Sequence, residues 1–209
     1  MKKHDYDESY FADYAYQKST HCDCYFSLLS KLIPNLKDKK LLDIGCATGL
    51  FIKNFNCEEC LGIDISKYAI MHAQQQFPTK RFKMIDLNKE SLVNDDIFDL
   101  ITMFDVIEHL YNFLNLKQLI EDNLAKNGYL IVTTPNSNSV LRFISLSRFT
   151  GEIDDTHTIL FTPYTLDFFL RRIGLKKVCL FTPYRFYNKN NFITRKCLFG
   201  GQVFAIYKK

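Results

Sequence analysis

Two glycines in one short segment are the residues of this sequence best placed to bind a ligand. The segment LLDIGCATGLF (41–51) is an apolar run followed by Gly45 and Gly49. Such a turn, at the carboxyl end of a strand, lets the backbone approach a ligand closely. A phosphate-binding P-loop is excluded because no Lys-Ser/Thr pair follows the glycines. Ala47 stands where the dinucleotide fingerprint needs its second glycine, so the pattern favours a nucleoside ligand without a pyrophosphate.

Aspartates at the ends of successive apolar runs fit the same ligand. Asp64 lies 19 positions after Gly45, where its carboxylate can accept hydrogen bonds from both ribose hydroxyls. Asp86 is placed to accept from the exocyclic amine of an adenine, with Leu87 against the ring. Asp43 is placed to orient the glycine turn or to face a ligand ammonium. A single aspartate at a strand end more commonly caps a turn, but the ordered set favours ligand binding.

His109 and His157 are the candidates for acid–base chemistry. An imidazole has a pKa suited to removing a proton from an acceptor hydroxyl. If residues 105–110 begin a short helix, Asp105, Glu108 and His109 share one face. Together with His157 they would offer two carboxylates and two imidazoles, a set that suits Mg, Mn or Zn. A histidine base without metal, and a purely structural role for Glu108 and His109 in capping the loop, are open alternatives.

These residues are positioned by strands and helices that alternate along the chain, which is the pattern of a parallel sheet with helices on both faces. The predicted strands cover residues 41–45, 60–65, 82–87, 98–104 and 128–134. The predicted helices cover residues 24–33, 50–55, 67–76 and 114–124, and a further helix begins at Thr162-Pro163 and ends at Gly174. Two final strands, 175–181 and 202–208, have no helix of useful length between them and are expected to be antiparallel. The sequence predicts an α/β fold with a seven-stranded, mostly parallel sheet.

Length and composition favour one globular domain in the cytoplasm. The chain has 209 residues, a typical size for a single domain. No apolar run approaches the ~20 residues needed to span a bilayer, and no apolar segment follows the N-terminal lysines as in a secretory signal. Seven cysteines, an odd number, show no disulfide framework. Cys57 and Cys60 have metal or redox spacing, and Cys22 and Cys24 could complete a zinc site, but reduced incidental thiols are the simpler interpretation.

Charge is unevenly distributed along the chain. The net charge is +4, while residues 142–209 contain 12 Lys and Arg against 4 Asp and Glu. This asymmetry indicates either an anionic partner for the C-terminal third or an ordinary solvated basic surface. A net charge of +4 is modest for a surface that follows nucleic-acid phosphates. Nucleic acid is therefore not the expected partner.

Taken together, these motifs resemble the class I S-adenosylmethionine-dependent methyltransferases. The matching segments are DIGCATG (43–49), GIDIS (62–66), MIDL (84–87), FDVIEHL (104–110) and NGYLIVTTPN (127–136). The resemblance covers about residues 38–209, predicted as the methyltransferase domain, with residues 1–37 as an N-terminal cap segment. It implies a Rossmann-like sheet with a reversed last strand, and S-adenosylmethionine as cofactor. The predicted cofactor contacts are Asp43, Gly45, Cys46, Ala47, Gly49, Asp64, Ile65, Asp86, Leu87 and Phe104.

Three further segments resemble one subgroup, the ubiquinone-biosynthesis O-methyltransferases and the methyltransferases of sugar and natural-product clusters. They are the ExxEH-like Asp105–His109, the strand end Thr134–Asn136, and His157 before Phe161-Thr162-Pro163. We therefore expect an enzyme that O-methylates a small molecule, such as a sugar, quinol or phenolic precursor, and that accommodates an anionic or nucleotide-linked acceptor.

Three alternatives stay open for the activity. Small-RNA 2′-O-methyltransferases use a similar ExxEH-plus-His arrangement for a divalent ion, so an RNA 2′-O-methyltransferase with a metal is the first. The others are an N-methyltransferase of an amino sugar and a non-catalytic nucleoside-binding regulator. The sequence makes no prediction of the oligomeric state.

Overall fold

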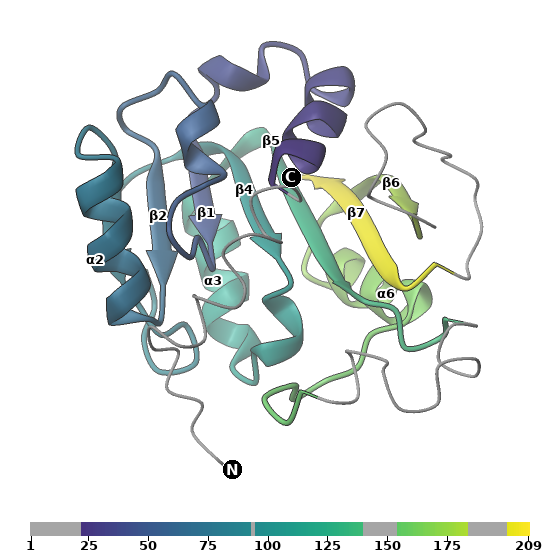
Figure 1. Ribbon diagram of the computed structural model, residues 1–209. Coiled ribbons are helices and arrows are strands. Elements are labelled where there is room, and N and C mark those ends of the chain that lie inside the picture. The colour runs from purple at the N-terminus through teal and green to yellow at the C-terminus, as the bar shows by residue number, and fades with distance from the viewer. Residues whose placement is uncertain (1–21, 93–94, 140–153, 184–199) are drawn as a thin grey trace.

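The core of the protein is a twisted seven-stranded sheet (Figure 1). The computed structural model describes residues 22–92, 95–139, 154–183 and 200–209. The strands are β1 (Leu41–Ile44), β2 (Leu61–Asp64), β3 (Arg81–Met84), β4 (Phe98–Phe104), β5 (Leu124–Pro135), β6 (Lys176–Phe181) and β7 (Gln202–Lys208). Their order across the sheet is β3-β2-β1-β4-β5-β7-β6. Strands β1 to β5 pair in parallel, whereas β7 is antiparallel to both β5 and β6. The predicted α/β, Rossmann-like sheet with a reversed last strand is confirmed.

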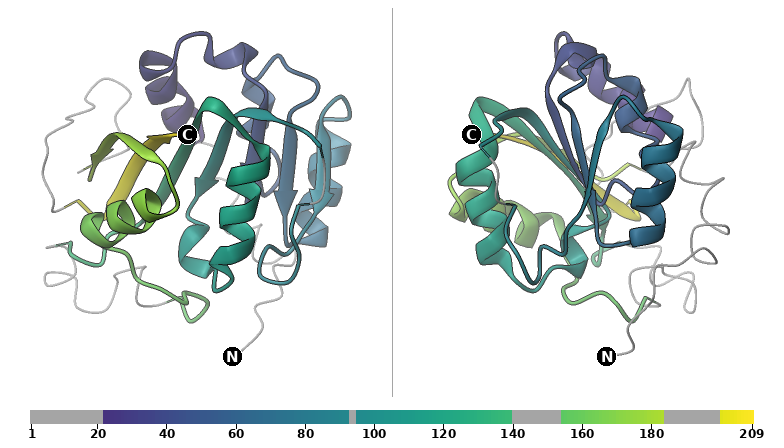
Figure 2. Two further views of the ribbon diagram at one scale, coloured as in Figure 1. Left: turned by 180° about the vertical axis from the view of Figure 1, so that it is seen from behind. Right: turned by 90° about the vertical axis from the view of Figure 1, so that its left-hand side faces the viewer.

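Helices cover both faces of this sheet (Figure 2). A helix over residues 22–32 and α2 (Lys67–Gln76) lie on one face, and α3 (Phe113–Asn123) and α6 (Pro163–Arg172) lie on the other. Neighbouring residues of a strand point to opposite faces, so Leu41 packs in the first of these two layers and Leu42 in the second. Both residues are fully buried. The sheet is therefore apolar on both sides, as parallel sheets with helical crossovers require.

Several predicted boundaries differ from the structure. The predicted helix 50–55 is only a 3₁₀ turn, η2 (Ile52–Asn54), because the spacing of Phe51, Ile52 and Phe55 reflects their burial rather than a full helix. The predicted strand 82–87 ends at Met84. Strand β5 begins at Leu124, where its residues already pair with β4, four positions earlier than predicted.

The segment that carries His157 runs directly into α6, whose start is strongly specified. The Thr162 side chain accepts a hydrogen bond from the Thr165 amide, and the Thr165 side chain caps the Thr162 amide in return. Pro163 occupies the first turn, and Gly174 has a φ of 93° just after the helix end. These are the start and stop signals expected from the sequence.

The helix over residues 22–32 belongs to the main core. Its Tyr25, Leu28 and Leu29 are buried in the same cluster as Leu41 of β1 and Phe204 of β7. Residues 1–21, the larger part of the predicted cap segment, lie outside the described residues. The division at residue 37 stays a prediction.

Two further expectations concern the thiols and the membrane. No disulfide joins the six cysteines of the described ranges to one another. Within those ranges, no helix combines the length and the apolar character that a membrane crossing needs.

Candidate active site

The glycine turn follows β1 and lies against the end of β4. Gly45, Ala47 and Gly49 all have positive φ, at 72°, 47° and 79°. The amides of Gly45 and Cys46 donate to the carbonyl of Ile63 at 2.8 and 3.0 Å, which ties the turn to β2. A Cβ at Gly45 would lie 2.3 Å from Cγ2 of Val106. Glycine is therefore required there both by the backbone conformation and by the close packing of Val106.

Asp64 holds the turn and faces the same edge of the sheet. Its Oδ2 accepts from the Ala47 amide at 2.9 Å, and its Oδ1 accepts from the Ser66 amide at 2.8 Å. A carboxylate has about four lone-pair sites, so these bonds are compatible with further bonds from ribose hydroxyls. The next residue, Ile65, is apolar yet 46% exposed. An acceptor of hydrogen bonds beside an exposed apolar side chain fits a nucleoside such as that of S-adenosylmethionine.

Asp43 lies beneath the turn and is buried. The Thr102 hydroxyl of β4 donates to its Oδ1 at 2.6 Å. Burial raises the pKa of Asp43 from 3.8 to about 7, and the nearby Asp64 carboxylate adds to that rise. The structure thus links Asp43 to β4, while its contact with a ligand ammonium stays a prediction.

Asp86 is engaged in a turn of its own. Its Oδ1 accepts from the Asn88 amide at 3.1 Å, and its Oδ2 lies 2.8 Å from Nζ of Lys89. Leu87 is buried. This is the turn-capping geometry common for an aspartate at a strand end, so the adenine contact of Asp86 and Leu87 stays a prediction.

The remaining predicted cofactor contacts are Cys46 and Phe104. Cys46 is buried, and burial raises the pKa of its thiol. Phe104, at the end of β4, is half-buried between two aromatic rings, stacked on Tyr25 at 4.5 Å and edge-on to Phe51 at 4.9 Å between centroids. The ring of Phe104 is thus held in place beside the glycine turn by both neighbours.

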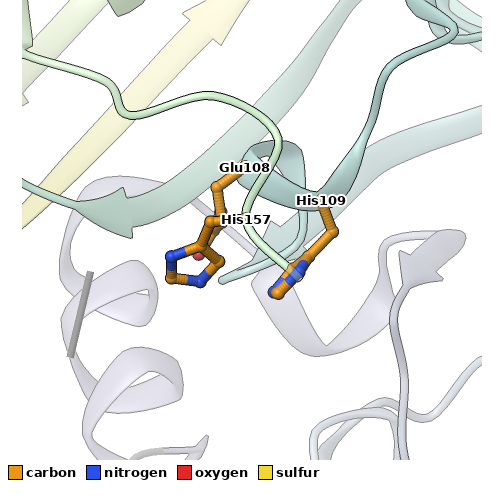
Figure 3. A group of neighbouring side chains, drawn as sticks. All are labelled: Glu108, His109 and His157. Carbon is orange, nitrogen blue, oxygen red and sulfur yellow. The ribbon is translucent and has the colours of Figure 1, made fainter. Parts of the chain in front are cut away.

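Glu108, His109 and His157 form a compact polar group (Figure 3). Glu108 and His109 come from the 3₁₀ turn η3 (Ile107–His109), and His157 comes from the loop that precedes α6. One potential ligand atom from each residue lies within 4.8 Å of the others, and the two imidazole centroids are 4.7 Å apart. The Thr158 and Ile159 amides donate to the Glu108 carbonyl at 2.8 and 3.2 Å. These two bonds fasten the His157 loop to η3.

The environment of this group perturbs its protonation. Glu108 is 1% exposed, and neither carboxylate oxygen has a hydrogen-bond partner among the described residues. Burial, with the neighbouring Asp105, raises the pKa of Glu108. Burial, with the neighbouring His157, lowers the pKa of His109, so this imidazole is neutral near pH 7. A buried carboxyl group without a partner beside two imidazoles fits a bound cation or an acceptor hydroxyl.

Asp105 is not part of this group, contrary to the predicted set of four ligands. Its φ of 55° breaks the helical spacing that would have aligned it with Glu108 and His109. Its Oδ1 instead accepts from the Thr133 hydroxyl at 3.1 Å and from Nε2 of Gln202 at 2.6 Å. Among the described residues, Glu108, His109 and His157 are the one group of three or more His, Cys, Asp or Glu side chains close enough to bind a metal. The described cysteines therefore do not belong to such a group.

The glycine turn and the histidine group belong to one site. Val106, which packs on Gly45, immediately precedes η3. Asn88 ties η3 to the segment after β3, because its amide donates to Asp86 Oδ1 and its Nδ2 donates to the His109 carbonyl at 3.1 Å. Both subsites therefore share the carboxyl edge of the parallel strands, where ligands bind in such folds.

Some residues of the site escaped the sequence analysis. Tyr25 donates to Gln202 at 3.1 Å, a contact between residues 177 positions apart that no local pattern signals. Asp154 and Thr156 contact the two histidines. Their Asp-x-Thr spacing beside His157 is a recognisable turn signal and could have been found.

Comparisons with known proteins agree with this fold. Residues 8–180 match a family model described as a methyltransferase domain. An uncharacterized protein of Haemophilus influenzae is 34% identical over 110 residues, which are 48% of this chain and 43% of the relative. A ubiquinone biosynthesis O-methyltransferase of Glaesserella parasuis is 29% identical over 108 residues, covering 47% of this chain and 46% of that protein. The chain spans less than half the length of these curated relatives.

A solved structure of similar fold covers nearly the whole chain. It is an S-adenosylmethionine-dependent methyltransferase from Archaeoglobus fulgidus, with a TM-score of 0.69 and 22% identity, covering 97% of this chain and 100% of that one. At this identity the likeness shows the fold alone. The family match extends over well over half of the chain, and the strand order and glycine turn agree with it. The chain therefore belongs to the class I S-adenosylmethionine-dependent methyltransferase family.

Proposed function

We propose that this chain transfers the methyl group of S-adenosylmethionine to a hydroxyl oxygen of a small molecule, such as a sugar, quinol or phenolic precursor. The observation that carries the proposal is the group of buried Glu108 with half-buried His109 and His157 at the same edge of the sheet as the glycine turn. A methyl acceptor with an ionisable hydroxyl needs such a group, because the hydroxyl must lose its proton. The name of the Glaesserella parasuis relative, a ubiquinone biosynthesis O-methyltransferase, supports oxygen as the acceptor atom.

The residues of the glycine turn bind the cofactor in this proposal. Gly45 and Gly49 let the backbone approach it, Asp64 accepts from its ribose hydroxyls, and Ile65 packs against its adenine ring. Asp43, beneath the turn, favours a cationic group above it. When bound, S-adenosylmethionine supplies an activated methyl group, so the protein has mainly to align the acceptor and exclude water.

His109 is the residue suited to take the acceptor proton. Its lowered pKa keeps the imidazole neutral near pH 7, which is the form that accepts a proton. General-base catalysis of this kind contributes about 10²–10⁴-fold to a rate. His157 lies close enough to share this task, with the ring centroids 4.7 Å apart.

A divalent cation fits the same three side chains. Both Glu108 oxygens are buried without a partner among the described residues, and one carboxylate with two imidazoles is a set that Mn²⁺, Mg²⁺ or Zn²⁺ accepts according to geometry. Such an ion would be held by Glu108, His109 and His157 and would supply Lewis-acid stabilisation of the acceptor oxygen.

The test is to incubate the protein with methyl-labelled S-adenosylmethionine and an extract of its host, with and without EDTA, and to fractionate the label. We expect label in low-mass or glycan material. Loss of labelling in EDTA that Mn²⁺, Mg²⁺ or Zn²⁺ restores would support the metal. Glu108→Gln should then lose the cation-dependent labelling, whereas Glu90→Gln, at an exposed position, should retain it. The absence of transferred label would contradict the proposal.

Two results of this labelling experiment would support methyl transfer but to a different class of acceptor. Label in RNA that falls steeply with ionic strength would favour the RNA 2′-O-methyltransferase, and the Lys- and Arg-rich C-terminal third would become its contact surface. Label on amines that EDTA does not affect would favour an N-methyltransferase of an amino sugar.

A further inference from the structure

Thr156 contacts one ring nitrogen of His109 through two oxygens. Nδ1 of His109 lies 2.9 Å from Oγ1 of Thr156 and 3.3 Å from the Thr156 carbonyl oxygen. The Thr156 hydroxyl in turn donates to Oδ1 of Asp154. The three residues form a chain of hydrogen bonds from a carboxylate to an imidazole.

The direction of each bond in this chain follows from the chemistry of its atoms. A carbonyl oxygen and an ionised carboxylate can only accept hydrogen bonds. The single hydroxyl proton of Thr156 goes to Asp154, so Oγ1 presents a lone pair to His109. Both oxygens around Nδ1 are therefore acceptors, and Nδ1 must carry the proton. The neutral imidazole then has its lone pair on Nε2.

Asp154 is itself held in one orientation. Its Oδ1 also accepts from the Thr156 amide at 2.9 Å, and its Oδ2 lies 3.8 Å from Nε2 of His157. One carboxylate thus reaches both histidines of the group, directly at His157 and through Thr156 at His109.

The anchoring of the loop does not depend on the Thr156 side chain. The Thr158 hydroxyl shares its one proton between the carbonyls of Glu108 and Leu110, at 3.0 and 2.7 Å, and the amides of residues 158 and 159 donate to the Glu108 carbonyl as well. Removing the Thr156 hydroxyl should therefore leave the loop on η3 and remove only the bonds of that hydroxyl to His109 and to Asp154.

We propose that Asp154 and Thr156 are positioning residues that hold His109 in its Nδ1–H tautomer and so present the Nε2 lone pair to the acceptor hydroxyl or to a cation. The identity of the group that contacts Nε2 rests on the proposed function, whereas the assignment of the tautomer does not. Partners of this kind behind a metal-binding histidine commonly change metal affinity by about 10–100-fold when removed.

The tautomer can be read directly by NMR. In protein labelled with ¹⁵N and held at pH 8 without cofactor, long-range proton–nitrogen correlations show which ring nitrogen carries hydrogen, and the His109 signals are assigned by their loss in His109→Asn. We expect Nδ1–H in the wild type, and Nε2–H to appear in Thr156→Val. Thr156→Ser, which keeps the hydroxyl, should restore Nδ1–H, and Thr79→Val, at an exposed turn, should change nothing.

A second variant and a second readout keep the test decisive. Asp154→Ala frees the Thr156 proton to point at Nδ1, so it too should increase Nε2–H. Calorimetric affinity for Mn²⁺ and Zn²⁺ should fall about 10–100-fold in Thr156→Val and recover in Thr156→Ser. Nε2–H in the wild type, or an unchanged tautomer in both variants, would overturn the proposal. Because the NMR measurement uses no methyl donor or acceptor, its failure is distinct from failure of the methyl-transfer proposal.

Discussion

At Gly45 the conformation and the surroundings of one residue both exclude a side chain. Its φ is 72°, and a Cβ would lie 2.3 Å from Cγ2 of Val106. Gly174 also has positive φ, 93°, but nothing lies within 4 Å of its Cβ position. Gly45→Ala suffers strain and a clash, and Gly174→Ala suffers strain only. We predict that Gly45→Ala lowers the free energy of unfolding by about 1–3 kcal/mol more than Gly174→Ala does, as measured by chemical denaturation. Equal losses would contradict the close packing of Val106 on the turn.

Asp43 gives the protein a pH dependence that a single substitution can isolate. Its pKa rises from an ordinary 3.8 to about 7 on folding, mainly through burial. Between these values the folded protein holds a proton that the unfolded chain has released, so stability falls as pH rises from about 4 to 7. The slope is up to about 1.4 kcal/mol per pH unit from this group.

Asp43→Asn should remove that contribution while keeping the side chain's size. We predict that stability measured by urea denaturation declines less between pH 4 and 7 in Asp43→Asn than in the wild type. Asp99→Asn, at a half-buried position at the other end of the strands, is the matched control and should keep the wild-type decline. Parallel curves for the wild type and Asp43→Asn would show that Asp43 titrates normally.

At the scale of elements, regular segments were predictable because their side chains repeat with the period of the element. The prediction for β4 (Phe98–Phe104) and that for α2 (Lys67–Gln76) agree with the structure residue for residue. Both are long enough for burial on one or both faces to leave a clear pattern. Short connections such as η2 (Ile52–Asn54) carry too few residues to separate a turn from a helix.

The site was only partly predictable for the same reason. The glycine turn and Asp64 are local features that the sequence displays directly. The positive φ of Asp105 overrode the helical spacing used to place it with Glu108. The sequence analysis grouped His157 with His109 by residue type, without a local pattern that places them together, and the structure brings the two rings together. The links through Thr156 and through Gln202 depend on tertiary contacts that spacing does not encode.

The helix over residues 22–32 supports the cofactor edge through Tyr25. Its ring stacks on Phe104 at 4.5 Å and its hydroxyl donates to Gln202 at 3.1 Å. We predict that Tyr25→Ala costs about 3–5 kcal/mol of stability and weakens S-adenosylmethionine binding, because Phe104 loses its stacking partner. Tyr25→Phe keeps the ring and should cost only about 0.5–1.5 kcal/mol. Denaturation and calorimetric titration measure both effects, and unchanged cofactor affinity in Tyr25→Ala would contradict the support role.

Across the whole molecule, the two ends of the strands have different characters. The carboxyl edge carries the glycine turn, Asp64 and the histidine group. The opposite edge is held by ion pairs, where Lys40 and Arg81 each lie 2.8 Å from the Asp96 carboxylate. The candidate site residues thus lie at one edge, which is where ligands bind in other open α/β sheets. The fold determines where the reaction takes place, whereas the acceptor depends on the side chains of the site.

We propose that this edge of the sheet holds two subsites, one for the cofactor and one for the acceptor, and that the two histidines serve the acceptor subsite. The most direct measurement is the rate of labelled-methyl transfer by His109→Ala and His157→Ala at saturating S-adenosylmethionine, with the dissociation constant of the cofactor determined on the same preparations. His72→Ala, at an exposed position on α2, is the control. We predict that transfer falls by about 10²-fold or more in both variants while cofactor affinity stays close to that of the wild type. Wild-type transfer rates in both variants, or a loss of cofactor binding that matches the loss of transfer, would show that the histidines do not serve a separate acceptor subsite.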